Sequence, residues 1–264
     1  MKFHFFKLHG AGNDFIIFDN RPNHLNRNMN EIYSALCDRH FGVGADGVML
    51  FQEAEGFDFE MVYFNADGKE STMCGNGGRC MVRFAEMLGM KQKKFHFLAV
   101  DGAHTAETDG QNIRLQMQDV HAVHRYENYY VLNTGSPHAI QFMENIAAIQ
   151  VKAEGAKVRY GERFHAEGIN VNFVEVLSEN SIKVRTYERG VEDETLSCGT
   201  GVTAAALMYS NEVKLPAGQH LIQVDTLGGK LMVAFKKLSE KEFTHIWLIG
   251  PAQFVFSGMI ELSV

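Results

Sequence analysis

Two cysteines of this 264-residue chain begin the same short motif, and the residue types in that motif suit proton-transfer chemistry. Cys74 begins Cys-Gly-Asn-Gly and Cys198 begins Cys-Gly-Thr-Gly, and each motif leads into a helical pattern. The first N–H groups of a helix have no partner within it, and the helix dipole adds positive potential there. Because such a position also lowers the pKa of a thiol, each motif predicts a reactive cysteine beside a site for a small anion such as a carboxylate.

The segments that precede the two motifs are also alike. In each copy a strand pattern ends in a tyrosine, Tyr63 or Tyr187, eleven residues before the cysteine, and a glutamate stands four residues before it. The two cysteines are 124 positions apart, which is about half the chain. This repetition predicts a duplicated domain, in agreement with a chain length near the upper limit for one hydrophobic core.

Two such units facing each other would clamp one carboxylate between two helix ends, with a sulfur on each side of the adjacent carbon. A thiolate on one side can remove the α-proton while a thiol on the other side delivers a proton to the opposite face. The helix ends would stabilise the negative charge that builds on the carboxylate. The sequence therefore predicts two-base inversion of a carbon centre by a coupled thiol pair. Which cysteine is the thiolate at rest stays open.

We expect the other two cysteines to be buried structural residues, because Cys37 lies on the apolar side of the Asn30–Arg39 helical pattern and Cys80 lies a turn into its helix without a glycine cradle. Four cysteines are too few for a disulfide scaffold and favour a reducing compartment. The spacing of six between Cys74 and Cys80 fits no usual zinc-ligand pair, so no metal is expected. A redox pair would need a Cys-x-x-Cys motif, which the sequence lacks.

The surrounding elements are mostly strands. Short alternating apolar runs outnumber helical patterns, which we place at Asn30–Arg39, Gly77–Leu88 and Val202–Ser210. Strands and helices do not alternate regularly, and this favours an α+β fold with mixed or antiparallel sheets. The run Gly42–Gly47 spells G-x-G-x-x-G, but a helical pattern precedes it and a strand follows it. Since dinucleotide binding needs the reverse order, we expect a tight turn there.

Composition limits the partners of the protein. Lys and Arg total 25 against 32 for Asp and Glu, so the net charge of −7 argues against nucleic acid or anionic lipid as a partner. No apolar run approaches the roughly 18 residues of a membrane-spanning helix. The first ten residues lack the apolar core of a signal peptide, and we expect a cytoplasmic protein.

At this point the motifs match a known family. The chain resembles the diaminopimelate epimerases over essentially its whole length, in the segments His9–Phe15, Asp38–Gly47, Phe64–Gly68, Met73–Gly77, Pro137–His138, Asn170–Phe173, Tyr187–Gly190 and Ser197–Gly201. The resemblance implies a cofactor-independent isomerase that interconverts LL- and meso-diaminopimelate on the route to lysine and peptidoglycan. It also implies a homodimer and a closing motion around the substrate.

The fold that the resemblance implies has two pseudo-symmetric domains, each a central helix wrapped by a curved mixed β-sheet. Residues 1–118 with 253–264 would form the domain that contains Cys74. Residues 119–252 would form the domain that contains Cys198.

The resemblance also assigns roles to residues. Cys74 and Cys198 would be the catalytic bases, and His138 and Glu188 would tune their pKa values. The residues expected to bind substrate are Asn13, Gly75, Asn76, Gly199 and Thr200 at the reacting end, and Asn65, Asn170, Arg189 and the nearby Glu188 at the distal end. His138 could instead be a structural histidine, and Glu188 with Arg189 a surface ion pair. Ser136 stands where the family often has Asn, and whether it contacts substrate stays open.

Three other functions compete with this interpretation. Proline and hydroxyproline racemases have a similar mechanism, but they carry His two residues after the first catalytic cysteine, where this chain has Asn76. They also need no distal charged pocket. Cofactorless isomerases of the phenazine-biosynthesis type lack the cysteine pair. A non-catalytic amino-acid-binding protein would not require two thiols, and an activity assay separates it from an enzyme.

Overall fold

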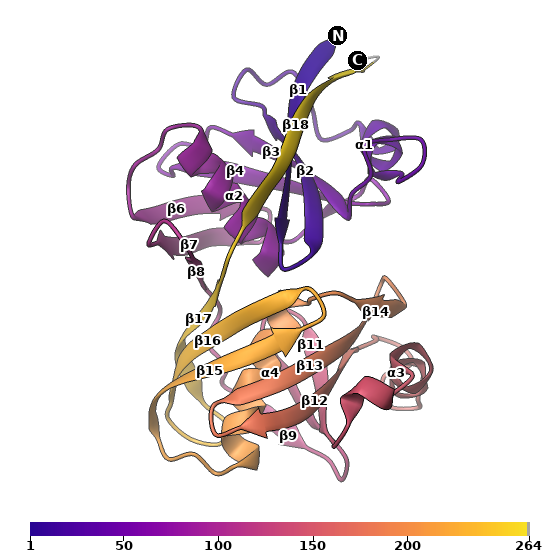
Figure 1. Cartoon of the computed structure of the whole chain (residues 1–264), viewed down its shortest axis with the longest axis vertical. Coiled ribbons are helices and arrows are strands. Elements are labelled where there is room, and N and C mark those ends of the chain that lie inside the picture. The colour runs from indigo at the N-terminus through magenta and orange to yellow at the C-terminus, as the bar shows by residue number, and fades with distance from the viewer. Residues whose placement is uncertain (263–264) are drawn as a thin grey trace. The chain divides into compact units, whose positions relative to one another are not determined.

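The computed structural model describes residues 1–262, which divide into two compact units (Figure 1). The first unit comprises Met1–Leu115 and the C-terminal segment from Pro251, and the second comprises Gln116–Gly250. Both units combine a large mixed sheet with few helices, so the predicted α+β class is confirmed. Within residues 1–262, none of the helices is long and apolar enough to cross a membrane.

The first unit is built on a mixed sheet with the spatial order β18-β1-β2-β3-β4-β6-β7-β8. The pairs β2–β3 and β4–β6 are parallel, the other neighbours are antiparallel, and β5 forms a hairpin with β4. Its elements are β1 (Lys2–Gly10), β2 (Asn13–Asp19), α1 (Asn30–Cys37), β3 (Gly47–Gln52), β4 (Phe59–Asn65), β5 (Glu70–Ser71), α2 (Gly75–Met87), β6 (Lys94–Ala99), β7 (Gly102–Thr108), β8 (Ile113–Gln116) and β18 (Gln253–Glu261).

The second unit repeats this topology strand by strand. Its order is β9-β10-β11-β12-β13-β15-β16-β17, with parallel pairs at β11–β12 and β13–β15 and a β13–β14 hairpin. Its elements are β9 (Val123–Arg125), β10 (Tyr130–Asn133), β11 (Pro137–Phe142), the 3₁₀ turn η1 (Ile146–Ala148), α3 (Val151–Arg159), β12 (Asn170–Ser178), β13 (Ser181–Glu188), β14 (Asp193–Thr195), α4 (Gly199–Glu212), β15 (Gly218–Thr226), β16 (Gly229–Lys237) and β17 (Phe243–Gly250). Because both parallel pairs fall at equivalent places, α2 and α4 are equivalent helices.

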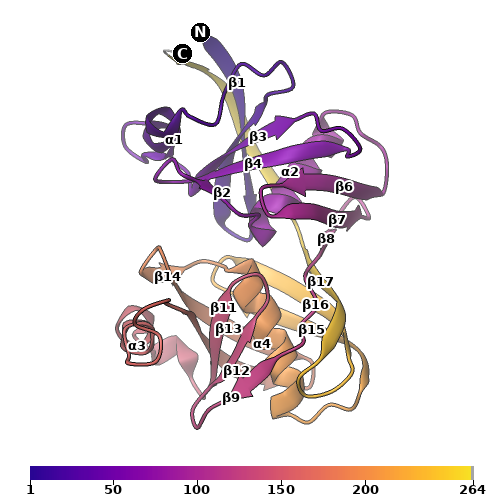
Figure 2. The ribbon, with the colours of Figure 1, turned by 180° about the vertical axis from the view of Figure 1, so that it is seen from behind.

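The helices α2 and α4 are the central helices of their units. Strands lie on both sides of α4 when the two opposite views are compared, and α4 packs against the strands β10–β13 and β15–β17 (Figures 1 and 2). Its run Ala204–Met208 is completely buried. A helix that is apolar around its whole circumference has to be enclosed in this way.

The helix boundaries differ from the sequence-based ones. The helices expected at Gly77–Leu88 and Val202–Ser210 begin earlier, at Gly75 and Gly199, directly after the two cysteines. Glycine has poor intrinsic helix propensity, so the apolar pattern shows only after the glycines have passed. The first helix ends at Cys37 rather than Arg39.

Candidate active site

Both cysteines of the repeated motif occupy the N-cap position of a central helix. The backbone of Cys74 is extended, and its carbonyl accepts the first α2 hydrogen bond from the Gly78 N–H at 2.7 Å. Cys198 has the same conformation, and its carbonyl accepts from the Val202 N–H at 2.8 Å. The N–H groups of the first helical turn have no intrahelical acceptor and carry positive potential, so each sulfur lies at the start of a potential anion site.

The Cys74 thiol lies beside Asn13, at the start of β2. The thiol donates to Asn13 Oδ1 over 3.5 Å, and Asn76 Nδ2 donates to the same oxygen at 3.2 Å. Asn76 is 1% exposed and belongs to the first turn of α2. Three residues that the sequence assigned to the reacting end are thus in contact within the first unit.

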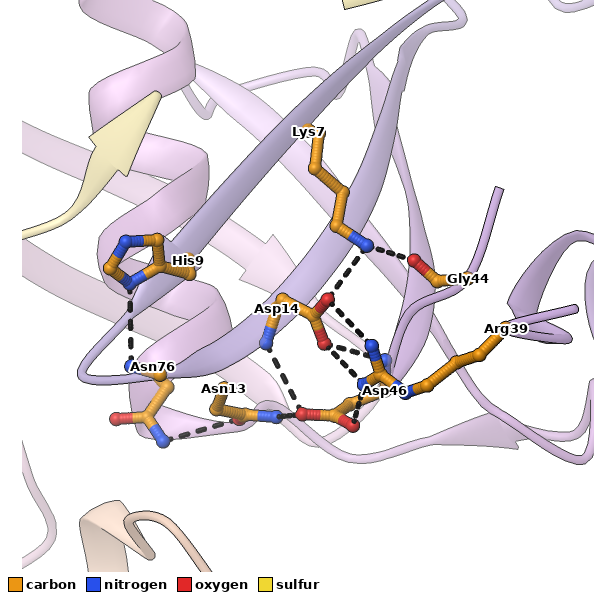
Figure 3. Close-up of polar contacts among 9 residues, drawn as sticks. Lys7, His9, Asn13, Asp14, Arg39, Gly44, Asp46 and Asn76 are labelled. Atoms are coloured by element: carbon orange, nitrogen blue, oxygen red, sulfur yellow. Dashed lines mark hydrogen bonds and ion pairs between the residues drawn. The ribbon is translucent and has the colours of Figure 1, made fainter. Parts of the chain in front are cut away.

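A network of charged residues fixes the orientation of Asn13 (Figure 3). Asn13 Nδ2 donates to Asp46 Oδ2 at 2.7 Å, so its oxygen must face Cys74. Arg39 bridges Asp46 and Asp14 at 2.8 Å each. Lys7, on β1, pairs with Asp14 at 2.7 Å. Burial acts to raise the pKa of Asp14, but hydrogen bonds from Arg39 and Lys7 hold it below the usual value.

The Gly42–Gly47 segment therefore has a role that its sequence did not suggest. It is a turn that leads into β3, as expected, and it contributes Asp46 to the network. Its Gly44 carbonyl accepts a hydrogen bond from Lys7 (Figure 3). The pairing of Phe15 on β2 with Gly47 on β3 brings Asp46 next to Asn13.

In the second unit, the equivalent position beside the cysteine holds a cluster of hydroxyl groups and one histidine. Thr200 Oγ1 is 3.5 Å from the Cys198 sulfur and 2.9 Å from His138 Nε2. Ser136 Oγ lies 3.0 Å from both Thr200 Oγ1 and His138 Nε2. Ser136 thus contacts Thr200 much as Asn13 contacts Asn76 in the first unit.

His138 is an uncharged group. Complete burial, with a smaller contribution from the Arg189 charge, lowers its pKa to about 3. Its Nδ1 accepts a hydrogen bond from Asn172 Nδ2 at 3.0 Å. His138 is therefore not an imidazolium, and its connection to the Cys198 sulfur runs through the Thr200 hydroxyl.

This buried histidine predicts a loss of stability in acid. An unfolded histidine titrates near 6.5, so between about pH 6.5 and 3 the unfolded chain binds a proton that the folded chain excludes. The stability that His138 contributes is complete above about pH 6.5 and falls as the pH drops, by at most about 1.4 kcal/mol per pH unit. We expect His138→Gln to flatten the decline in unfolding free energy between pH 7 and 5, measured by urea denaturation.

The control for this measurement is His124→Gln, which replaces an exposed histidine of the same unit. We expect its pH profile to follow the wild type. A His138→Gln profile as steep as the wild-type profile would contradict the prediction.

Three of the four residues expected at the distal end, Asn170, Glu188 and Arg189, lie within the second unit. Asn170 Oδ1 accepts from the Arg189 backbone N–H at 2.8 Å, and Asn170 Nδ2 donates to Ser136 Oγ at 3.1 Å. The Arg189 guanidinium donates to the Glu167 carbonyl at 2.8 Å. Glu188 accepts from the Thr195 hydroxyl at 3.0 Å. Asn65, in the first unit, is the exposed last residue of β4, the strand equivalent to β13.

Sequence analysis missed three residues that hold these groups in place. Asp46 orients Asn13, and Asn172 contacts His138. Arg79 is completely buried, and it donates to the Gly75 carbonyl at 3.1 Å and to Asn76 Oδ1 at 2.9 Å. The sequence contains a signal for two of them. Arg79 lies one helical turn from the Cys-Gly-x-Gly motif, and Asn172 is a polar residue on an apolar strand, two positions after Asn170.

The two units of the same topology form a fold that other solved structures share. Over 99% of the chain it is similar to a phenazine biosynthesis protein of the PhzF family from Bacillus anthracis, which it covers completely, with a TM-score of 0.75 and 15% identity. It is also similar to a hydroxyproline epimerase from Agrobacterium vitis, with a TM-score of 0.64 and 12% identity over 98% of this chain and 92% of that one. At these identities the likeness shows the fold alone.

Sequence comparison gives the particular family. Residues 5–123 and 130–255 match the diaminopimelate epimerase family. A diaminopimelate epimerase from Flavobacterium psychrophilum is 47% identical over 97% of this chain and 99% of its own length. Another from Chlorobaculum tepidum is 40% identical over 97% of this chain and all of its own. The chain belongs to the diaminopimelate epimerase family, and the resemblance inferred from the motifs is confirmed.

Proposed function

We propose that this protein catalyses the cofactor-independent epimerisation of LL-diaminopimelate to meso-diaminopimelate, with Cys74 and Cys198 as the paired base and acid. The observation that carries the proposal is the placement of both cysteines at the N-cap of the central helix, in two units of the same topology. Its relatives are named for this activity.

The proposed chemistry needs only the two sulfurs. One thiolate takes the α-proton, so a C–H bond breaks and an S–H bond forms. The other thiol gives its proton to the opposite face of the carbanion, which restores the C–H bond with inverted configuration. One turnover therefore exchanges the protonation states of the two sulfurs, and proton exchange with solvent after product release resets them for the next turnover in the same direction. We assign the backbone N–H groups of Gly75, Asn76, Gly199 and Thr200 to the substrate carboxylate.

We assign the distal amino-acid end of the substrate to Asn65, Asn170 and Arg189, with Glu188 nearby. A guanidinium supplies a forked and permanently charged partner for a carboxylate, and this supports the assignment of Arg189. Ser136 supports the pocket indirectly, because its hydroxyl accepts from Asn170 Nδ2.

The experiment is α-hydrogen exchange in deuterated water with three substrates: LL-diaminopimelate, L-proline and trans-4-hydroxy-L-proline. We expect deuterium incorporation and inversion with LL-diaminopimelate. Exchange with proline or hydroxyproline alone would favour the racemase interpretation. Tight binding of LL-diaminopimelate without any exchange would favour a non-catalytic binding protein, and either result would overturn the proposal.

The network around Asn13 gives a further prediction. We expect Asp46→Ala to lower kcat/KM for LL-diaminopimelate on the order of tenfold, because Asn13 loses the carboxylate that orients its amide toward Cys74. The control is Glu55→Ala, which removes the same charge from an exposed loop of the same unit. If the two variants have equal activity, Asp46 has no role in positioning Asn13.

We also propose that the protein is a cytoplasmic homodimer that acts in lysine biosynthesis. Strand β18 carries four exposed large apolar side chains, Phe254, Val255, Phe256 and Met259, and exposed groups of this kind support association with another chain. None of the four cysteines, which all lie within residues 1–262, is in a disulfide bond, and this suits a reducing compartment. A monomeric mass by light scattering would contradict the dimer, and fractionation of cells would test the compartment.

A further inference from the structure

The hydrogen bonds around Cys198 form a network in the second unit whose direction is set by two buried asparagines. The network contains Ser136, His138, Asn170, Asn172 and Thr200. Asn170 and Asn172 lie on the same side of β12, two residues apart, and both are less than 5% exposed. Hydroxyl and imidazole groups can donate or accept, so the asparagine amides decide which way the protons point.

Carbonyl and N–H groups of the backbone fix the orientation of both amides. Asn172 Nδ2 faces the Ala139 carbonyl at 3.3 Å, and Asn172 Oδ1 accepts from the Thr186 hydroxyl at 2.9 Å. Asn170 Nδ2 faces the Pro137 carbonyl at 3.3 Å. A carbonyl oxygen can only accept, so each amide must turn its NH₂ group toward it.

The orientation of Asn172 determines the tautomer of His138. Asn172 Nδ2 donates to His138 Nδ1 at 3.0 Å, so Nδ1 carries a lone pair. The ring is uncharged, and its single proton is therefore on Nε2. From Nε2 it is donated to the hydroxyls of Thr200 and Ser136, at 2.9 and 3.0 Å.

Only one arrangement then gives every hydroxyl proton an acceptor within the network. Ser136 Oγ is next to a donating Asn170 amide and a donating His138 Nε2, so its own proton must go to Thr200 Oγ1. Thr200 Oγ1 then accepts from its other neighbours. Its proton has one acceptor left, the Cys198 sulfur at 3.5 Å.

We propose that Asn172 is a positioning residue that holds His138 as the Nε2–H tautomer and thereby directs the Thr200 hydroxyl proton to the Cys198 sulfur. Donation to sulfur favours the thiolate over the thiol. The network thus prepares Cys198 to act as a base, and its catalytic meaning rests on the proposed function. Ser136 is a second positioning residue. Because Ser136 donates its hydroxyl proton to Thr200 Oγ1, the Thr200 proton cannot point toward Ser136 and points toward the Cys198 sulfur instead.

The equivalent sulfur of the first unit has a contact of the opposite polarity. Cys74 contacts the Asn13 carbonyl oxygen, which accepts and cannot donate. The two units therefore share their topology and their helix ends but differ in the hydrogen-bond partner that they offer to sulfur.

The test measures the titration of Cys198 by its rate of alkylation with iodoacetamide between pH 5 and 10, followed by peptide mass spectrometry. The measurement is made in a Cys74→Ala background, so that the titration curve reports Cys198 alone and is not coupled to a second thiol. We expect Thr200→Val to reduce the alkylation rate below the thiol pKa about tenfold, because it removes the hydroxyl and keeps the side-chain volume. Thr200→Ser keeps the hydroxyl and should retain the parent profile within about twofold.

Asn172→Leu tests the positioning role in the same assay. This change leaves the Thr200 hydroxyl in place, but His138 no longer has the amide that holds it as the Nε2–H tautomer. We therefore expect the Cys198 pKa to rise, as we expect in Thr200→Val. The ionisable groups on the segments around the start of α4 are His138 on β11, Glu188 and Arg189 at the end of β13, and Glu194 on β14. None of these is changed in any variant used for alkylation, so a shift in the alkylation profile reports the network.

NMR spectroscopy tests the tautomer of His138 in the wild-type protein, so this test does not depend on whether an Asn172 variant folds. ¹⁵N NMR of the imidazole nitrogens, with the signal assigned by its loss in His138→Gln, should show a protonated Nε2 and an unprotonated Nδ1. A protonated Nδ1, or identical alkylation profiles for Thr200→Val and Thr200→Ser, would overturn the proposal. Alkylation needs no turnover, so failure of the epimerase assay would affect only the proposed function.

Discussion

Replacing either Cys74 or Cys198 with alanine is expected to reduce kcat/KM for LL-diaminopimelate by a factor of about a thousand or more. Each substitution removes one of the two groups that move a proton, and general acid–base catalysis by a positioned side chain contributes roughly 10²- to 10⁴-fold. A reaction that inverts a centre needs a proton acceptor on one face and a donor on the other. Loss of either sulfur therefore blocks the same reaction, and the two losses should not multiply in the double variant.

The chain provides matched controls for this experiment in its other two thiols. Cys37 and Cys80 are both buried. Burial raises the pKa of Cys37 to about 12 and that of Cys80 further, so neither thiol ionises near neutral pH. We expect Cys37→Ala and Cys80→Ala to keep epimerase activity and to lose only stability, measured by thermal unfolding. Wild-type activity in either Cys74→Ala or Cys198→Ala would refute the two-base mechanism.

Some features of the fold could be predicted from sequence because their causes are local. The Cys-Gly-x-Gly motifs, with a strand before each and an apolar helix after it, are contained within short segments, and they indicated both the duplication and the position of the two cysteines at helix starts. The expected burial of Cys37 and Cys80 also followed from local apolar patterns. The starts of α2 and α4 were predicted too late in the sequence. The glycines that follow each N-cap cysteine have low helix propensity and weaken the helical pattern there.

Other features depend on contacts between segments that are distant in sequence. Asp46 reaches Asn13 only because β2 and β3 pair in parallel with Phe15 opposite Gly47, and no local pattern encodes that register. In the same way, the contact of Asn172 with His138 depends on the parallel pairing of β11 with β12. The family resemblance implied which residues would bind substrate, whereas the structure shows the neighbours, such as Asp46 and Asn172, that contact those residues.

The second large effect is expected from a single methyl group at the start of α4. A Cβ atom at Gly201 would lie 2.3 Å from Asn172 Oδ1 and 3.3 Å from His138 Cε1. Both neighbours are fully buried and bonded, so neither can move without breaking the network. We expect Gly201→Ala to destabilise the protein by ~1–3 kcal/mol, the usual cost of overpacking, and to lower epimerase activity more than tenfold.

The control is the equivalent glycine of the first unit, at the same position of its helix. A Cβ at Gly77 would lie 3.1 Å from Met61 Cε and 3.2 Å from Met49 Sδ, which are the flexible ends of long side chains. Methionine adapts to such a change, and alanine is favoured over glycine inside a helix by about 0.5–1 kcal/mol. We therefore expect Gly77→Ala to match or exceed the wild-type stability in urea denaturation and to retain activity.

The double variant Gly201→Ala/Asn172→Ala separates the clash from the loss of the network. Removing the Asn172 amide gives the new methyl group room, so the double variant should be more stable than the sum of the two single changes predicts. Activity should not recover, because His138 and Thr200 no longer have the amide that orients them. Additive stabilities would mean that Gly201 is required for some reason other than its contact with Asn172, and recovered activity would mean that the amide does not position His138.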